Sequence, residues 1–419
     1  RAIGSGPYPG IGSAHLDLFQ AFAWRFWHLI RAGGRTAIVL PRGALSGSAL
    51  AKWRSEILSE GSFADVCFLT NTKNWIFEGV DGRYTVALTV IERGGENFTR
   101  FSGPFASEKD FRAHATELSE VSAEKFLTWS SSAAFPLIPD PMSAEIFDLL
   151  RRSPRFDEKS PDWEFRPIQG DFNATTDKGK FEFDVEDANG RFPVLSGGAF
   201  NLWDPDFGTP YGYADPKSIR NDHRTKVERG AKTARSAYYQ LKFEVGGLPV
   251  DRARIAFRDV TNQTNTRTTI ACLLPPGSIF THKAPILVRR TDNVRAEAAL
   301  LGVLSSIPFD WYMRRWVELS LSFELLNPSP VPRPNLDSAK GARVVEVAGR
   351  LAAVDDRYAE WAADVGVAVG TANEEPVKSD LIAELDALVS LLYGLSEEQV
   401  EHVFATSHRG GDYQPRLNA

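Results

Sequence analysis

The segment from Lys217 to Arg267 concentrates charged side chains that could contact nucleic acid. It carries 12 Lys and Arg residues against 5 Asp and Glu residues, inside a chain of 419 residues whose formal net charge is −6. Clustered cations bind phosphates, and neighbouring aromatic and polar side chains can contact a groove. By itself the charge pattern fits a solvated helix and hairpin surface equally well. The cations are Lys217, Arg220, Arg224, Lys226, Arg229, Lys232, Arg235, Lys242, Arg252, Arg254, Arg258 and Arg267, and Tyr211, Tyr213, Tyr238 and Tyr239 lie close by.

Other reactive residue types lack the spacing that metal binding or catalysis needs. His15, His223 and His282 show no ligand spacing with one another or with acidic residues. Asp204 and Asp206 flank a proline, and Asp-Pro-Asp is typical of a turn. The sequence therefore predicts no metal site.

The totals narrow the class of protein. A chain of 419 residues is long enough for two or three domains. Its 2 cysteines, Cys67 and Cys272, each lie in an apolar run, so neither a zinc ribbon nor a disulfide framework is expected, as fits a reducing cytoplasm. No apolar run reaches membrane-spanning length, and nothing resembles a signal peptide. Because the chain begins with Arg1, we expect that its N-terminus is not the native one.

The elements of the first hundred residues follow an α/β order. Apolar residues at three- and four-residue steps predict a helix over 16–30, and the run 36–40 predicts a fully buried strand that stops at Pro41. A helix over 49–58, a strand over 65–69 and a strand over 84–91 complete the order. This order suits the closing edge of a doubly wound, Rossmann-like sheet whose opening strands and Gly-rich first turn are missing.

The rest of the chain divides by composition. Prolines mark residues 101–161 as a connecting region, and 162–333 read as short strands and turns of a mixed α/β domain. After the proline cluster, residues 334–419 form an acidic, helical C-terminal region with helices over 343–363 and 379–393.

Two series of motifs carry a family resemblance. The first series is Asp17-Leu18-Phe19 with Gly33-Gly34, the strand 36–41, Trp53-Arg54 and Ile76-Phe77. In this order it resembles the later motifs of the γ-class DNA adenine-N6 methyltransferases. These enzymes depend on S-adenosylmethionine and belong to type II and type IIG restriction-modification and related phage-defence systems. Three further segments, 192–211, 256–275 and 306–332, are similar to segments of that family's recognition domains. The stretch Leu392-Tyr393-Gly394-Leu395-Ser396 resembles a motif near the family's C-terminus.

The resemblance implies that residues 1–100 are the C-terminal part of a methyltransferase catalytic domain and 162–333 a DNA target recognition domain. The family's cofactor loop of the form FxGxG and its NPP(Y/F/W) tetrapeptide are absent from the chain. S-adenosylmethionine would therefore be bound mainly by residues of a missing N-terminal half, in the same or a separate chain, and we expect this chain alone to be inactive.

One residue of the base pocket is expected within the chain. Phe77 matches the family's aromatic residue that stacks on the extruded base. Its alternative reading is a buried aromatic before a strand. Asn74, Trp75 and Gly79 favour a loop at this position.

The predicted partner is double-stranded DNA, with two sets of contacts. The residues expected to read base edges are Arg258, Asn262, Asn265 and Arg267, which we call the base-reading set. The residues expected to contact phosphates are Arg224, Lys226, Arg229 and Lys232. Two alternatives remain open, a stand-alone DNA specificity subunit and a carbohydrate- or protein-binding module that uses the abundant aromatics.

Overall fold

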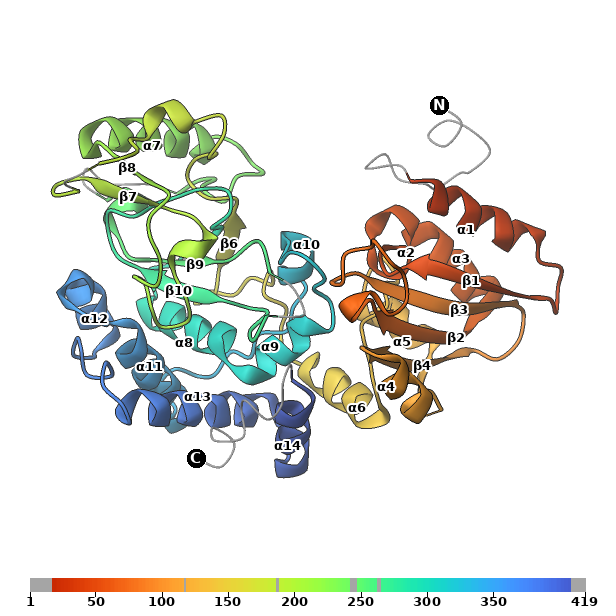
Figure 1. Ribbon diagram of the computed structural model, residues 1–419. Coiled ribbons are helices and arrows are strands. Elements are labelled where there is room, and N and C mark those ends of the chain that lie inside the picture. The colour runs from red at the N-terminus through yellow and green to blue at the C-terminus, as the bar shows by residue number, and fades with distance from the viewer. Residues whose placement is uncertain (1–16, 117, 186–187, 242–246, 262–264, 408–419) are drawn as a thin grey trace. The chain divides into compact units, whose positions relative to one another are not determined.

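The computed structural model describes residues 17–116, 118–185, 188–241, 247–261 and 265–407. The chain forms two compact units (Figure 1), of which unit 1 comprises residues 1–151 and 314–318, and unit 2 comprises residues 152–313 and 319–419. Both units mix helices with open sheets. The predicted fold class, an α/β chain with an open sheet followed by a mixed α/β domain and helices, is confirmed.

Unit 1 is built on one five-stranded sheet with the order β1-β3-β2-β4-β5. Strand β3 is antiparallel to both β1 and β2, whereas β2 and β4 are parallel. The strands are β1 (Arg35–Pro41), β2 (Gly61–Thr70), β3 (Thr85–Arg93), β4 (Phe98–Phe105) and β5 (Ser119–Ser122). The helices are α1 (Leu18–Leu29), α2 (Gly43–Ser46), α3 (Ala51–Glu60), α4 (Glu108–His114), α5 (Ala123–Trp129) and α6 (Pro141–Leu150).

The predicted helices and strands of the first hundred residues are present, but β1 is not the fully buried strand that was expected. That prediction is wrong, because β1 lies at the edge of the sheet and its burial alternates, with Thr36, Ile38 and Leu40 turned toward the covered face. Val39 is 55% exposed on the other face. A continuous apolar run therefore encodes a strand that is buried on one face only.

The two faces of the unit 1 sheet differ. One face carries an aromatic core in which Phe63 packs on Trp53 and Phe135, with ring centroids 5.4 and 4.8 Å apart. On the other face, rows of small or apolar side chains cross the strands, one of them formed by Val39, Leu88 and Cys67. These residues are exposed or half-buried in the described chain.

The segment 314–318 belongs to unit 1 because a buried arginine holds it there. The Arg42 guanidinium donates to the backbone oxygens of Arg315, Trp316 and Val317 at 2.8, 2.9 and 3.2 Å. Trp316 packs against Phe147 of α6, with ring centroids 5.7 Å apart. Sequence analysis did not predict that residues 314–318 pack in unit 1, because this segment lies far from Arg42 along the chain.

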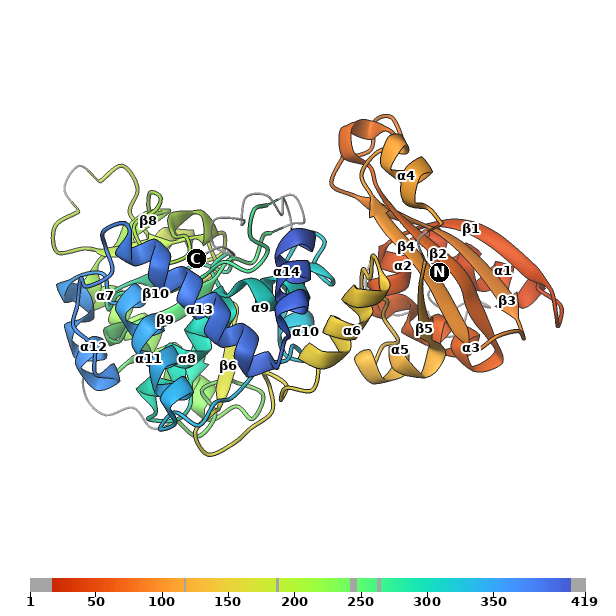
Figure 2. The ribbon, with the colours of Figure 1, turned by 90° about the horizontal axis from the view of Figure 1, so that it is seen from below.

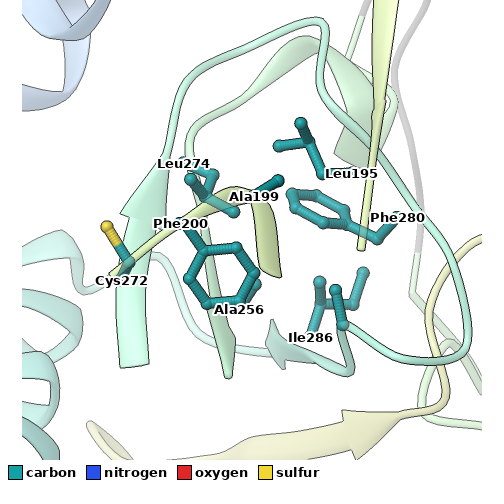
Figure 3. Packing of buried hydrophobic residues seen from close by; sticks show 9 residues of the cluster. Leu195, Ala199, Phe200, Ala256, Cys272, Leu274, Phe280 and Ile286 are labelled. Carbon is teal, nitrogen blue, oxygen red and sulfur yellow. The ribbon is translucent and has the colours of Figure 1, made fainter. Parts of the chain in front are cut away.

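Unit 2 contains two small sheets, one of order β10-β9-β12-β6 and one of order β11-β7-β8. Figure 3 shows side chains from both sheets pointing toward one another, with the fully buried Phe200 between Cys272 and Ile286. The strands are β6 (Phe165–Ile168), β7 (Phe192–Leu195), β8 (Gly212–Ala214), β9 (Arg254–Phe257), β10 (Ala271–Leu274), β11 (Ile279–Phe280) and β12 (Ile286–Arg289).

Helices cover the four-stranded sheet of unit 2, with α8 packed on β10 and α11 and α12 packed on α8 (Figures 1 and 2). The predicted single helix over 343–363 is wrong, because residues 353–358 interrupt it and the Tyr358 hydroxyl donates to the Leu273 carbonyl at 3.0 Å. The helices are α7 (Pro216–Ala231), α8 (Val294–Ser305), α9 (Ile307–Arg314), α10 (Phe323–Leu326), α11 (Ala339–Ala352), α12 (Ala359–Val365), α13 (Val377–Tyr393) and α14 (Glu397–Thr406).

Candidate nucleic-acid interface

Helix α7 carries most of the predicted phosphate contacts. The Asp215 carboxylate accepts a hydrogen bond from the Ser218 backbone amide at 2.8 Å and caps the helix, and Pro216 stands in its first turn. Ile219, His223 and Val227 recur every four residues and are buried. This narrow stripe packs against the rest of unit 2, and the remaining arc of the helix can carry polar residues.

Three of the four predicted phosphate contacts have free cationic groups. Arg224, Arg229 and Lys232 are exposed. Lys217 is exposed on the first turn of the same helix. Among the described residues, no carboxylate lies within ion-pairing distance of these four residues, which we call the α7 cations. Positions 224 and 229 differ by about 140° around a helix, so the charges spread over the whole exposed arc.

Lys226, the fourth predicted phosphate contact, is exposed, but its ammonium is engaged by the domain itself. Its ammonium donates to the carbonyl oxygens of Asp171 and, at 3.4 Å, of Gly170. Burial lowers the pKa of Lys226, and the Asp171 carboxylate opposes that shift. Arg220 is similarly engaged, with its Nε 2.8 Å from Asp251 Oδ1. These two residues attach α7 to the domain.

A buried charge network lies beneath α7. Asp171 accepts two hydrogen bonds from Arg254, at 2.8 and 3.0 Å, and a third from the Phe280 amide at 3.0 Å. His223 Nε2 lies 3.2 Å from the same carboxylate. Burial by itself would raise the pKa of Asp171, but Arg254 and His223 hold that pKa well below its ordinary value. The network joins α7 to β9 and β11 and fixes the helix on the domain.

Arg258, a predicted base-reading residue, is half-buried directly after β9. Its Nε and Nη2 both donate to the Phe200 carbonyl oxygen, the former at 3.0 Å, and its guanidinium lies 5.6 Å from the Phe207 ring centroid. Burial lowers the pKa of Arg258. A guanidinium has five N–H donors, so those that Phe200 leaves unused remain able to contact a base edge.

Arg267 does not fit the predicted base-reading role. Its side chain is buried, and Nη2 donates to the carbonyl oxygens of Ser305 and Ser306 at 2.7 and 2.9 Å. Asp310 lies 3.6 Å from its Nε. The residue joins the 265–270 segment to the start of α9, and reaching a groove would require breaking these bonds. We therefore correct the prediction and assign Arg267 a structural role.

Of the two asparagines in the base-reading set, only Asn265 lies within the described residues. Asn265 is half-buried and its Nδ2 donates to the Thr261 hydroxyl at 3.3 Å. Asn262 lies outside the described residues. The roles of both asparagines stay predictions.

Phe77 lies on a loop of unit 1, 41% exposed, between β2 and β3. The fully buried Asn71 organises this loop. Its Oδ1 accepts from the amides of Ile76 and Phe77 at 3.1 and 3.0 Å, and its Nδ2 donates to the carbonyls of Phe77 and Val80 at 3.0 and 2.9 Å. The loop is thus fixed while the Phe77 ring stays accessible, as a stacking role requires. Sequence reasoning did not single out Asn71.

The described residues of unit 1 do not fit S-adenosylmethionine. A cleft of about 330 Å³ is lined by Arg35, Ser62 and Glu92, at the amino ends of β1 and β2. Ligands of open α/β sheets bind outside the carboxyl ends of the strands. A Gly-rich turn between a strand and a helix is also absent from the described part of unit 1. We therefore derive no chemical step through this cofactor.

Two kinds of feature are absent from the described residues. No group of three or more His, Cys, Asp or Glu side chains is placed to hold a metal ion. No helix in the described ranges is both long and apolar enough to cross a membrane.

Comparison with known proteins defines the fold. No family model matches the sequence, and no curated protein is similar to it. Among solved structures, the type IIL restriction-modification enzyme MmeI in complex with DNA is similar at 12% identity and a TM-score of 0.50, over 95% of this chain and 53% of MmeI. The chain thus spans about half the length of that enzyme.

Two further structures are more distant. The type IIG restriction endonuclease BpuSI has 13% identity and a TM-score of 0.34, over 93% of this chain and 51% of its own. The DrdV–DNA complex has 10% identity and a TM-score of 0.28, over 81% and 40% of the two chains. With TM-scores below 0.5, these two structures carry no argument, and at 12% identity the likeness to MmeI concerns the fold alone.

Proposed function

We propose that this chain is the DNA-recognising part of a restriction-modification or phage-defence DNA adenine-N6 methyltransferase. The observation that carries the proposal is the set of α7 cations, three exposed charges on α7 and Lys232 at its C-cap, which meet no acidic partner among the described residues. The likeness to MmeI, which was solved with DNA bound, extends over 95% of the chain and supports the same partner.

The methyltransferase part of the proposal rests on the incomplete sheet of unit 1. In the described chain β1 has one hydrogen-bonded neighbour, β3, and its second edge is open. A helix that leads into a strand of an open α/β sheet normally follows a parallel strand through a right-handed crossover. A strand that precedes α1 would therefore pair with the free edge of β1.

Exposed apolar surfaces of unit 1 also support a missing N-terminal half as the partner of this unit. Leu18, Phe22 and Leu29, on the outward side of α1, are 65%, 55% and 64% exposed. The open sheet face around Val39 is apolar as well. Contiguous exposed apolar surface marks an interaction site. We assign these surfaces to the N-terminal half of the methyltransferase, which would also supply the S-adenosylmethionine site and the NPP(Y/F/W) residues.

DNA binding tests the recognition role. Fluorescence anisotropy with a 30-base-pair duplex of random sequence, titrated at several salt concentrations, should show an affinity that falls steeply as salt rises. The slope of log K against log[salt] should approach about −0.9 for each phosphate that is contacted. Absent or salt-insensitive association would overturn the proposal and favour a carbohydrate- or protein-binding module.

The genomic sequence upstream of Arg1 tests the methyltransferase part. An in-frame Gly-rich turn and an NPP(Y/F/W) motif would define the full chain, whose methylation of adenine can be measured by transfer of a labelled methyl group. In that chain Phe77→Ala should lower kcat/KM by about 10- to 100-fold, and Phe77→Trp should retain most activity, because stacking of one base contributes about 1–3 kcal/mol. If no such sequence exists, a stand-alone specificity subunit is the better reading.

A further inference from the structure

Three aromatic side chains of unit 2 are exposed, and one of them, Phe207, lies beside Arg258. Phe183, Phe207 and Tyr211 are 38%, 55% and 37% exposed. Single exposed apolar residues need no explanation, but a connected group does. The rings of Phe183 and Tyr211 meet edge to face, with centroids 5.4 Å apart and an interplanar angle of 89°.

Hydrogen bonds and close contacts connect the loops that carry these rings. The Tyr211 hydroxyl donates to the Ala174 carbonyl at 3.2 Å, and the Ala174 amide donates to His282 Nδ1 at 3.3 Å. The next residue, Lys283, lies against Gly197, where a Cβ would come 2.7 Å from the Lys283 carbonyl oxygen and 3.5 Å from Arg258 Cγ.

Arg258 closes the row, since its guanidinium lies over the Phe207 ring. We call this row the aromatic surface and define it by Lys178, Phe183, Tyr211, His282, Arg258 and Phe207.

Cations stand over two of the rings. Lys178 Nζ lies 5.4 Å from the Phe183 centroid, and the Arg258 guanidinium lies 5.6 Å from the Phe207 centroid. Of the nearby acids, Asp206 pairs with Arg357 and Asp259 with Lys283, whereas Asp184 is exposed. Flat rings with adjacent cations suit a ligand that has both apolar and phosphate groups, as the sugars, bases and backbone of DNA have.

The aromatic surface is continuous with α7. Lys180, two residues after Lys178, forms an ion pair with Asp222 of α7. Lys226 of α7 lies 5.6 Å from the centroid of Phe172, which precedes this loop. Ile219 of α7 packs in one apolar cluster with β7 and β8, the strands between which the Phe207–Tyr211 segment runs. The aromatic surface and α7 are therefore neighbours within unit 2.

We propose that the aromatic surface is a second contact of unit 2 with double-stranded DNA, in which the rings of Phe183 and Phe207 pack against sugars and bases. This inference rests on the DNA-binding function proposed above and adds a salt-independent component to it. The α7 cations provide the phosphate component. The two components can be separated by their salt dependence, because only the phosphate component releases counterions.

The experiment measures Kd for the random 30-base-pair duplex at several salt concentrations. The double variant Phe183→Ala/Phe207→Ala should raise Kd by about 10-fold at every salt concentration and leave the slope of log K against log[salt] unchanged. The variant Phe183→Tyr/Phe207→Tyr should bind like the wild type, because tyrosine keeps the ring. Leu391→Ala is the matched control, since Leu391 is 54% exposed on α13.

The outcomes separate the two proposals. If the wild type does not bind the duplex, the DNA-binding function fails, and this inference fails with it. If the wild type binds and the alanine double variant binds equally well, the DNA-binding function stands and the aromatic surface is not part of it. A change in the salt slope, or an equal loss in the Leu391→Ala control, would also overturn the inference. Thermal unfolding followed by circular dichroism checks that each variant is folded.

Discussion

Helix α7 and the segment 254–267 are both rich in cations, yet the fold uses them in opposite ways. On α7 only every fourth residue is buried, so Lys217, Arg224 and Arg229 remain in solvent. In the region of β9 and residues 265–267, Arg254 and Arg267 are instead buried, and they turn inward to a carboxylate and to carbonyl oxygens. Charge density in a sequence therefore does not separate arginines that bind a ligand from arginines that hold a domain together.

The strongest test of this contrast removes the buried partner of Asp171. Arg254→Met keeps the size of the side chain but leaves the fully buried Asp171 carboxylate without its main counter-charge. We expect the free energy of unfolding to fall by about 3–5 kcal/mol, the usual cost of an unpaired buried charge. Urea unfolding with a constant m value measures it, and a change below 1 kcal/mol would contradict a supporting role for Arg254.

The dependence of stability on pH tests the same network. The pKa of Asp171 is lowered in the folded state, so its contribution to stability is present above its unfolded pKa of about 4 and is lost as pH falls toward the folded pKa. Between about pH 5 and pH 2, the difference in unfolding free energy between the wild type and Asp171→Asn should therefore shrink. A difference that stays constant over this range would show that Asp171 does not ionise as the structure implies.

Arg267→Met sharpens the contrast between structural and binding arginines. Loss of its bonds to Ser305 and Ser306 should lower the free energy of unfolding by about 2–3 kcal/mol. The affinity of the folded protein for the duplex should not change. A stable variant that has lost its preference for one DNA sequence would restore the base-reading role.

The α7 cations give the smallest expected energy per residue. Arg224→Ala and Arg229→Ala should each weaken binding of the duplex by roughly 5-fold at 0.15 M salt and reduce the salt slope by about 0.9, with stability unchanged. The control is Lys109→Ala/Arg112→Ala, which removes two exposed cations from α4 of unit 1. Equal losses in the control and in the α7 variants would mean that general charge, and not α7, attracts the DNA.

Local sequence patterns determined the elements that rest on short-range physics. The spacing of apolar residues predicted α1, α3 and α13, and local patterns predicted three strands of unit 1, which are β1, β2 and β3, because one covered face imposes its period on the sequence. Composition singled out the basic segment 217–267 but not the helix α7 within it, and turn-forming residues placed Phe77 on a loop.

Only the tertiary structure decided which side chains face solvent. A strand of apolar residues reads the same at the edge and in the centre of a sheet, so β1 was misjudged. The burial of Arg267 depends on carbonyls about forty residues away, and the return of residues 314–318 depends on Arg42, more than two hundred residues earlier. The aromatic surface likewise joins loops that are distant in sequence. Such contacts leave no local periodicity, because they are fixed by the packing of whole elements.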